Sequence, residues 1–144
     1  MVIQRRQIVL AGALAVMRPL GATPEALQAA VRDFVGSAPL RDGRIRLDVA
    51  PLVENGNTVP LTVTVDSPMT AADHVRTIVI FNELNPQHDV ALFELGPRAG
   101  RATVATRIRL ATSQKLVALA RLSDGSCWRH QVEVVVTLAA CVEG

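Results

Sequence analysis

Aromatic residues are scarce in this chain of 144 residues. They make up 3% of it, as Trp128, Phe34, Phe81 and Phe93, and tyrosine is absent. Proteins that bind single-stranded nucleic acids stack bases on aromatic side chains, so the composition argues against that class. Hydrophobic residues make up 49% and charged residues 19%. This balance predicts a packed core built mainly from Val, Leu, Ile and Ala.

Motifs of catalysis and of metal binding are also lacking. The three histidines, His74, His88 and His130, are scattered and show no metal-ligand spacing. The chain contains neither a phosphate-binding loop nor a Ser-His-Asp signature. We therefore expect no cofactor and no metal, and we assign the histidines surface or structural roles.

The only long hydrophobic run lies near the N-terminus. Arg5-Arg6 precedes ten apolar residues, 8–17, which are too few for a membrane span of about 20 residues but fit a signal sequence. Residues 4–10 resemble a twin-arginine signal, although Ser before and Phe after the arginines are missing. The pattern predicts an export signal over residues 1–22, cleaved near Ala22, and a periplasmic protein with no membrane segment in its mature form. A disordered or amphipathic N-terminus is the alternative.

The formal charge of +2 depends on this leader. Three of the 15 basic residues, Arg5, Arg6 and Arg18, lie in it, which leaves 12 basic against 13 acidic residues. The basic balance therefore gives no support for nucleic-acid binding.

The next segment predicts a short helix. Thr23 is a good N-cap and Pro24 suits the first helical position. A single apolar stripe of Leu27, Ala30, Val31 and Phe34 follows at helical spacing, and Gly36 is a natural stop. We expect this stripe to pack on the domain.

From residue 44 the hydrophobic period changes from 3.6 to 2. Seven short alternating or apolar runs follow, separated by turn signals: 45–49, 61–65, 78–81, 91–95, 104–110, 116–122 and 128–138. Short strands with frequent turns and no helices between them predict an immunoglobulin-like antiparallel β-sandwich. The predicted domain spans residues 23–138, and the run 78–81 is apolar on both faces. Arg107 and Arg109 project from one strand and either steer anionic partners or line a solvated sheet face.

The two cysteines lie at opposite ends of the last predicted strand. That strand alone spans roughly 36 Å, whereas a disulfide needs Cα atoms within about 7 Å. We therefore predict two free thiols, with Cys127 a small apolar residue beside Trp128. We expect Cys141 to lie on a mobile tail, residues 139–144, from which it would reach roughly 13 Å from Thr137 when the tail is extended.

Such a tether suits a thiol that carries a group between partners. No Lys, Arg or His follows His130, so no sequence neighbour activates Cys141 as a nucleophile. Two alternatives remain open. The chain is an interaction module whose tail thiol is incidental, or it is a thiol enzyme whose activating group comes from elsewhere in the fold.

Several segments together resemble the SoxY family, the sulfur-carrier subunits of the periplasmic sulfur-oxidation (Sox) system. They are Glu54-Asn55-Gly56-Asn57-Thr58-Val59-Pro60-Leu61, Ser67-Pro68-Met69-Thr70, Phe81-Asn82-Glu83-Leu84-Asn85-Pro86, Ala105-Thr106-Arg107-Ile108-Arg109-Leu110-Ala111 and Leu122-Ser123-Asp124-Gly125-Ser126. The leader and the terminal cysteine fit as well, so the resemblance covers essentially the whole chain.

The resemblance implies a heterodimer with a SoxZ-like subunit and a covalent sulfur-carrier site at Cys141. It also implies that a haem-containing enzyme attaches thiosulfate oxidatively to the cysteine and that a hydrolase removes sulfate, while the carrier itself is not an enzyme. The family tail is Gly-Gly-Cys-Gly-Gly, whereas this chain has Ala139-Ala140-Cys141-Val142-Glu143. Its tail is stiffer, bulkier and more anionic.

Overall fold

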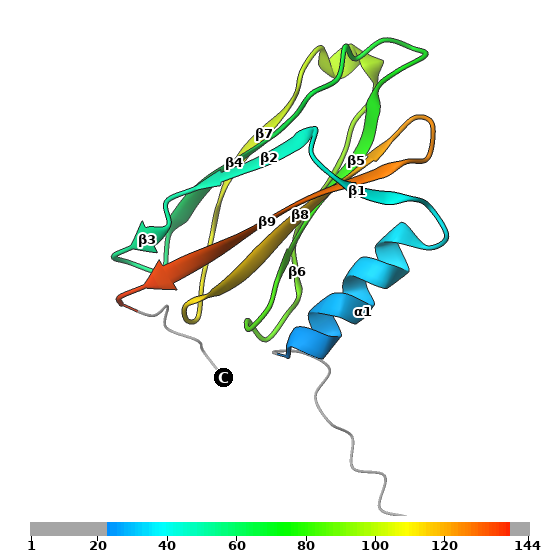
Figure 1. Cartoon of the computed structure of the whole chain (residues 1–144). Helices are drawn as coiled ribbons and strands as arrows, with labels where there is room; N and C mark the ends of the chain where they lie inside the picture. Colours follow the sequence, from blue (N-terminus) through cyan, green and yellow to red (C-terminus); the bar gives the residue numbers. More distant parts are fainter. Residues whose placement is uncertain (1–22, 139–144) are drawn as a thin grey trace, which may run out of the picture.

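The computed structural model describes residues 23–138. The predicted export signal (1–22) and the predicted carrier tail (139–144), which includes Cys141, lie outside this range. Two β-sheets pack face to face, and one helix lies against the larger sheet (Figure 1). The elements are α1 (Pro24–Val35), β1 (Leu40–Asp42), β2 (Ile45–Val49), β3 (Leu52–Val53), β4 (Val59–Val65), β5 (Val75–Asn82), β6 (Asp89–Glu94), η1 (Pro97–Ala99), β7 (Ala102–Ile108), β8 (Gln114–Leu122) and β9 (Cys127–Val136).

The two sheets confirm the predicted immunoglobulin-like antiparallel sandwich with a short N-terminal helix. The larger sheet has the order β1-β9-β8-β5-β6, and β3 also pairs with β9; the smaller sheet has the order β2-β4-β7. The longer neighbours are antiparallel. No helix among residues 23–138 is long and apolar enough to cross a membrane.

Two short strands were not predicted. β1 and β3 have 3 and 2 residues, and both run parallel to β9. The chain leaves the larger sheet after β1, contributes β2 to the smaller sheet, and returns as β3. Gly43 (φ 110°) and Arg44 (φ 58°) make the first switch with positive φ angles. Strands this short cannot display a period of 2, so the hydrophobic pattern misses them.

The core lies between the sheets, and a second, smaller core lies beneath α1. Because side chains alternate along a strand, β5 sends Ile78 and Ile80 into the main core and Val79 and Phe81 toward the helix. The predicted helical stripe packs on that outer face, with Leu27 only 6% exposed. The prediction that the run 78–81 is buried on both faces is thus confirmed.

The loops divide between two ends of the sandwich. The end of β9 lies beside the loops 54–58, 83–88 and 109–113, and we call this the tail end. The loops 66–74 and 123–126 lie at the opposite end, beside the start of β9 (Figure 1). Because Cys141 follows β9, the tail end is where the candidate carrier residue leaves the fold.

Candidate functional site

The polypeptide is held by hydrogen bonds up to the last described residue. The Leu138 carbonyl accepts a hydrogen bond of 2.8 Å from the Gly56 amide, and the Thr137 amide donates to the Val53 carbonyl at 3.0 Å. The Thr137 hydroxyl adds contacts of 3.4 Å and 3.3 Å to the carbonyls of Val53 and Glu54. Leu138 is therefore a fixed point from which the tail departs.

Two further segments hold this departure point. Ser113 Oγ accepts a hydrogen bond of 2.8 Å from the Val136 amide and lies 3.4 Å from the Val136 carbonyl. The Gly56 carbonyl accepts a hydrogen bond of 2.8 Å from the Leu110 amide. Gly56 thus joins the end of β9 to the loop after β7, and Cys141, three residues beyond Leu138, is at most roughly 10 Å away.

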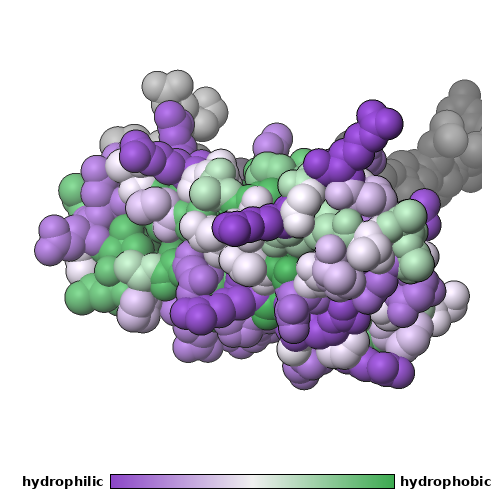
Figure 2. Space-filling model, turned by 90° about the horizontal axis from the view of Figure 1, so that it is seen from above, coloured by the Kyte–Doolittle hydropathy of each residue, from purple (hydrophilic) through white to green (hydrophobic). Residues whose placement is uncertain are grey.

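The surface around the departure point is apolar. Leu52 and Val135 are cross-strand partners on β3 and β9, and they are 59% and 51% exposed, while Leu138 is 63% exposed. Figure 2 shows hydrophobic side chains gathered at the end of the molecule where β3 lies, on the left of both views. This apolar surface therefore adjoins Leu138, the last described residue before the tail.

An amide network fixes the neighbouring loops. Asn85 Nδ2 donates to the Arg109 carbonyl at 2.7 Å, and Asn85 Oδ1 accepts from the Ala111 amide at 2.9 Å and from Gln114 Nε2 at 2.7 Å. The buried Asn82 accepts from the Asn85 amide at 2.9 Å and donates to two carbonyls of the same loop. The loop 83–88 is therefore fastened to the loop 109–113, which also carries the tail anchor Ser113.

Arg107 and Arg109 are exposed and line an open cleft of about 470 Å³ at the tail end. The other lining residues are Asn82, Asn85, Pro86, Gln87, Asp89, Val90 and Ile108. Within residues 23–138, neither arginine forms an ion pair. The cleft lining carries two positive charges and one negative charge, from Asp89.

Cys127 is a free and fully buried thiol at the opposite end of the sandwich. Its Sγ lies 4.0 Å from the Gly125 carbonyl, and β9 separates it from Val136 by roughly 30 Å. A group carried on Cys127 would be enclosed by protein. Of the two cysteines, only Cys141 follows the exposed departure point.

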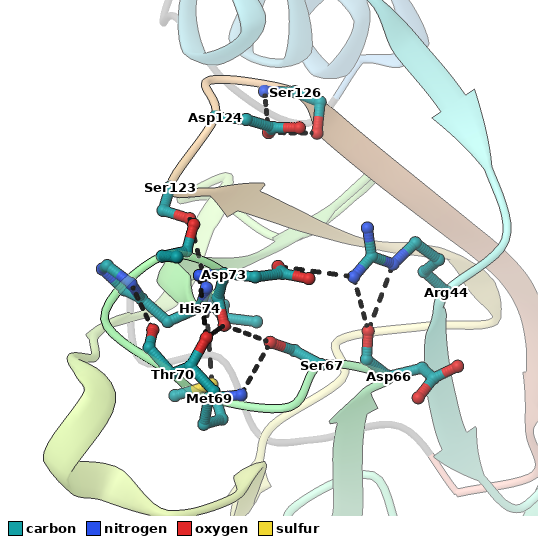
Figure 3. A network of polar contacts seen from close by, with 12 residues as sticks. Arg44, Asp66, Ser67, Met69, Thr70, Asp73, His74, Ser123, Asp124 and Ser126 are labelled. Carbon is teal, nitrogen blue, oxygen red and sulfur yellow. Dashed lines mark hydrogen bonds and ion pairs between the residues drawn. The ribbon is translucent and has the colours of Figure 1, made fainter.

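A second polar network lies at the opposite end of the sandwich, where it holds the loops together (Figure 3). Arg44 donates to the Asp66 carbonyl at 3.0 Å and 3.1 Å and lies 3.8 Å from Asp73. Ser123 Oγ accepts from the His74 amide at 3.1 Å and lies 3.3 Å from the Ala72 carbonyl. These contacts join the loop 66–74 to the turn 123–126 and to Arg44, which precedes β2, and Ser67 Oγ accepts a hydrogen bond of 3.2 Å from the Met69 amide within that loop. The sequence segments 67–70 and 122–126 therefore have structural roles.

The histidines are not gathered in one place. His74 Nδ1 lies 3.0 Å from the Thr70 carbonyl, and His130 Nδ1 accepts a hydrogen bond of 2.8 Å from the Leu47 amide. Both ring nitrogens of His88 are buried and have no hydrogen-bond partner within the described part of the chain. Residues 23–138 contain no group of three or more His, Cys, Asp or Glu that could hold a metal ion.

The fold and the sequence define a class of protein: a β-sandwich whose last strand leads into a C-terminal segment that contains a cysteine. The comparison with protein-family models then identifies the family. The model of the family "Sulfur oxidation protein SoxY" matches residues 31–141, a range that includes Cys141. The chain belongs to the SoxY family, as the resemblance predicted. A comparison with curated protein sequences found no match.

The solved structure of a SoxY agrees with this assignment. The sulfur carrier protein SoxY from Chlorobium limicola f thiosulfatophilum is 31% identical, with a TM-score of 0.64 over 78% of this chain and 96% of that chain. A superoxide reductase (neelaredoxin) from Ignicoccus hospitalis is 19% identical, with a TM-score of 0.59 over 80% and 89% of the two chains. A putative superoxide reductase from Thermotoga maritima is 23% identical, with a TM-score of 0.55 over 72% and 90%. The likeness to these reductases shows the fold alone.

Proposed function

We propose that this protein carries thiosulfate-derived sulfur covalently on Cys141 and presents it to partner enzymes of sulfur oxidation. The observation that carries the proposal is the family match, which runs through residue 141. The solved SoxY of Chlorobium limicola f thiosulfatophilum is a sulfur carrier protein. In our proposal the chain catalyses no reaction itself.

The loading step joins the cysteine sulfur to the outer sulfur of thiosulfate. The thiol loses its proton, a sulfur–sulfur bond forms, and two electrons leave to the haem-containing partner enzyme that acts as oxidant. The product is a cysteine S-thiosulfonate with one negative charge. A hydrolase then uses water to release sulfate and leaves a sulfane sulfur on Cys141.

The geometry of the described residues supports this role for Cys141. Leu138 is anchored and exposed, so the tail starts from a defined position on the surface. A tether of fixed origin raises the local concentration of its end near a docked partner. Cys127 is buried at the opposite end and lacks the access that a carrier thiol needs.

We further propose that the mature protein is periplasmic and pairs with a SoxZ-like subunit. Both statements rest on the family and on the twin-arginine-like residues Arg5 and Arg6. N-terminal sequencing of the protein purified from its host tests the export signal, with a first residue near Thr23 expected. Co-purification of a second subunit in a one-to-one ratio tests the pairing.

Mass spectrometry of the mature protein from thiosulfate-grown cells tests the carrier role. We expect adducts that contain sulfur, that reductant removes, and that map to Cys141. Cys141→Ser abolishes them, whereas the matched variant Cys127→Ala retains them because Cys127 is buried. An unmodified Cys141, or adducts shared equally by both cysteines, would instead favour an interaction module with an incidental tail thiol.

A further inference from the structure

The two arginine side chains of the cleft at the tail end do not take part in the polar networks that hold the loops of residues 23–138 together. Arg107 and Arg109 are exposed, and among residues 23–138 neither side chain forms a hydrogen bond, an ion pair or a ring contact. Arginine offers a planar fork of donors that matches anionic oxygens in a bidentate manner. Two such groups on one open cleft are therefore free to bind an anionic ligand.

The cleft is close to the point where the tail departs. Gly56 is hydrogen-bonded to Leu138 through its amide and to Leu110 through its carbonyl, at 2.8 Å each. Leu138 O and the amide nitrogen of Leu110 are therefore at most roughly 9 Å apart. Arg109 precedes Leu110, and Cys141 reaches roughly 10 Å from Leu138, so a group on Cys141 can meet the arginine side chains.

The cleft also offers donors and positioned loops besides the arginines. Asn82, Asn85 and Gln87 line it, and the Asn85 side chain holds the Arg109 carbonyl. The backbone beneath the arginines is consequently fixed before any ligand arrives. With Asp89 included, the lining retains a net charge of +1, which suits a group with one negative charge.

We propose that the Arg107–Arg109 cleft binds the sulfonate end of the group carried on Cys141. The inference rests on the proposed carrier function and adds a docking position for the loaded tail. The ligand is a cysteine-bound sulfonate whose terminal oxygens accept hydrogen bonds from the guanidinium groups. The unloaded thiol lacks these oxygens, so loading draws the tail toward the cleft, and removal of sulfate releases it.

Chemically loaded protein tests the cleft without partner enzymes. Tetrathionate converts the Cys141 thiolate to the S-thiosulfonate and releases thiosulfate, so no external oxidant is needed. We expect loading to shift the NMR signals of the Arg107 and Arg109 side chains and of the Asn85 amide, and Cys141→Ser to prevent these shifts. High salt should reverse them, because the pairing is exposed to solvent.

A neutral phosphine reductant supplies a kinetic readout, whereas a thiol would attack as its anionic thiolate and would itself respond to the arginine charges. In the double variant R107Q/R109Q we expect the loaded tail to be reduced roughly two- to fivefold faster than in the unsubstituted protein, the range expected for exposed charge pairs. Arg101→Gln is the matched control, because Arg101 is exposed and directly precedes the first residue of β7, whereas the cleft lies at the last residues of that strand. Its rate should equal that of the unsubstituted protein.

Two results would overturn the cleft proposal. One is quantitative loading of Cys141 with no shift of the arginine signals, and the other is an equal reduction rate in R107Q/R109Q and Arg101→Gln. Neither would affect the carrier function, which is judged separately by the adducts on protein from thiosulfate-grown cells. Conversely, an absence of those cellular adducts would refute the carrier function even if chemically loaded protein occupied the cleft.

Discussion

Asn85 is the side chain on which the geometry of the tail end most depends. Replacing it with alanine removes one donor and one acceptor from the loop 83–88. The donor holds the Arg109 carbonyl at 2.7 Å, and the acceptor holds the Ala111 amide and Gln114 Nε2 at 2.9 Å and 2.7 Å. Three hydrogen bonds, two to the loop 109–113 and one to the first residue of β8, are therefore lost at once.

The size of the effect follows from burial. A hydrogen bond contributes about 1 kcal/mol net, and a buried group left without a partner costs about 1–3 kcal/mol. Gln114 is 5% exposed, but its Nε2 also donates to the Thr112 carbonyl at 3.0 Å, and water reaches the half-buried Asn85. We therefore expect Asn85→Ala to lower the free energy of unfolding by about 2–3 kcal/mol.

Urea denaturation measures this loss. The midpoint should fall while the m-value stays constant, because the surface exposed on unfolding hardly changes. Gln87→Ala is the control, since Gln87 is exposed in the same loop and its side chain makes no hydrogen bond within residues 23–138. The control should change stability by less than about 0.5 kcal/mol. An equally small loss for Asn85→Ala would show that the network does not hold the loops together.

Three further predictions concern the helix, the tail anchor and an ion pair. Leu27→Ala should lower the free energy of unfolding by about 2–4 kcal/mol by opening a cavity beneath α1, measured by urea denaturation. Ser113→Ala should raise the hydrogen-exchange rate of the Val136 amide with little change in global stability, because that amide loses its 2.8 Å acceptor. The side-chain hydrogen bond and the charge of Arg129 hold the pKa of Asp42 below its usual range. The stabilisation is present above the unfolded-state pKa and is lost as pH falls through the folded-state pKa, so Asp42→Asn should flatten the acid limb of the stability–pH profile.

The longer elements could be predicted from the sequence because each satisfies a local rule. Thr23 caps α1, with its side chain accepting from the Ala26 amide at 3.1 Å, and the apolar stripe of the helix has the period that places it on one face. β5 lies in the interior of its sheet and is covered on both sides, which is why its run is apolar at consecutive positions.

The tail anchor could not be predicted from the sequence. It depends on Gly56, Ser113 and Leu138, which are far apart in the chain and meet only because β9 ends between two loops. The segment 54–61 was visible as part of the family resemblance, but its role in fixing Leu138 comes from tertiary contacts. The hydrogen-bond network of the Asn85 amide could not be predicted for the same reason, since the partners of Asn85 lie 24–29 residues further along the chain.

The prediction of Cys141 as the carrier residue could be made from the sequence alone, because a carrier thiol on a tether needs neither a neighbouring base nor a pocket. Its tail differs from the glycine-rich tail of the family, and the difference has two opposing consequences. Replacing glycine with a residue that has a Cβ lowers the entropy lost on ordering by about 0.4–1 kcal/mol per position. The same side chains obstruct a narrow channel shaped for glycine.

A tail with glycine at the four positions around Cys141 separates these effects. With the partner enzymes that the proposed carrier function requires, the glycine variant should bind more weakly than the chain with Ala139, Ala140, Val142 and Glu143, by up to about 2–4 kcal/mol over four positions. With partner enzymes of a glycine-tailed SoxY, the same variant should react faster than the unsubstituted chain, because the obstruction is gone. KM and kcat for each partner measure both effects, and an unchanged rate of Cys141 alkylation by iodoacetamide controls for thiol reactivity. Equal kinetics of the two tails with both partner sets would mean that the partner enzymes do not enclose the tail. The side chains that replace glycine in this chain would then have no steric effect on the reaction.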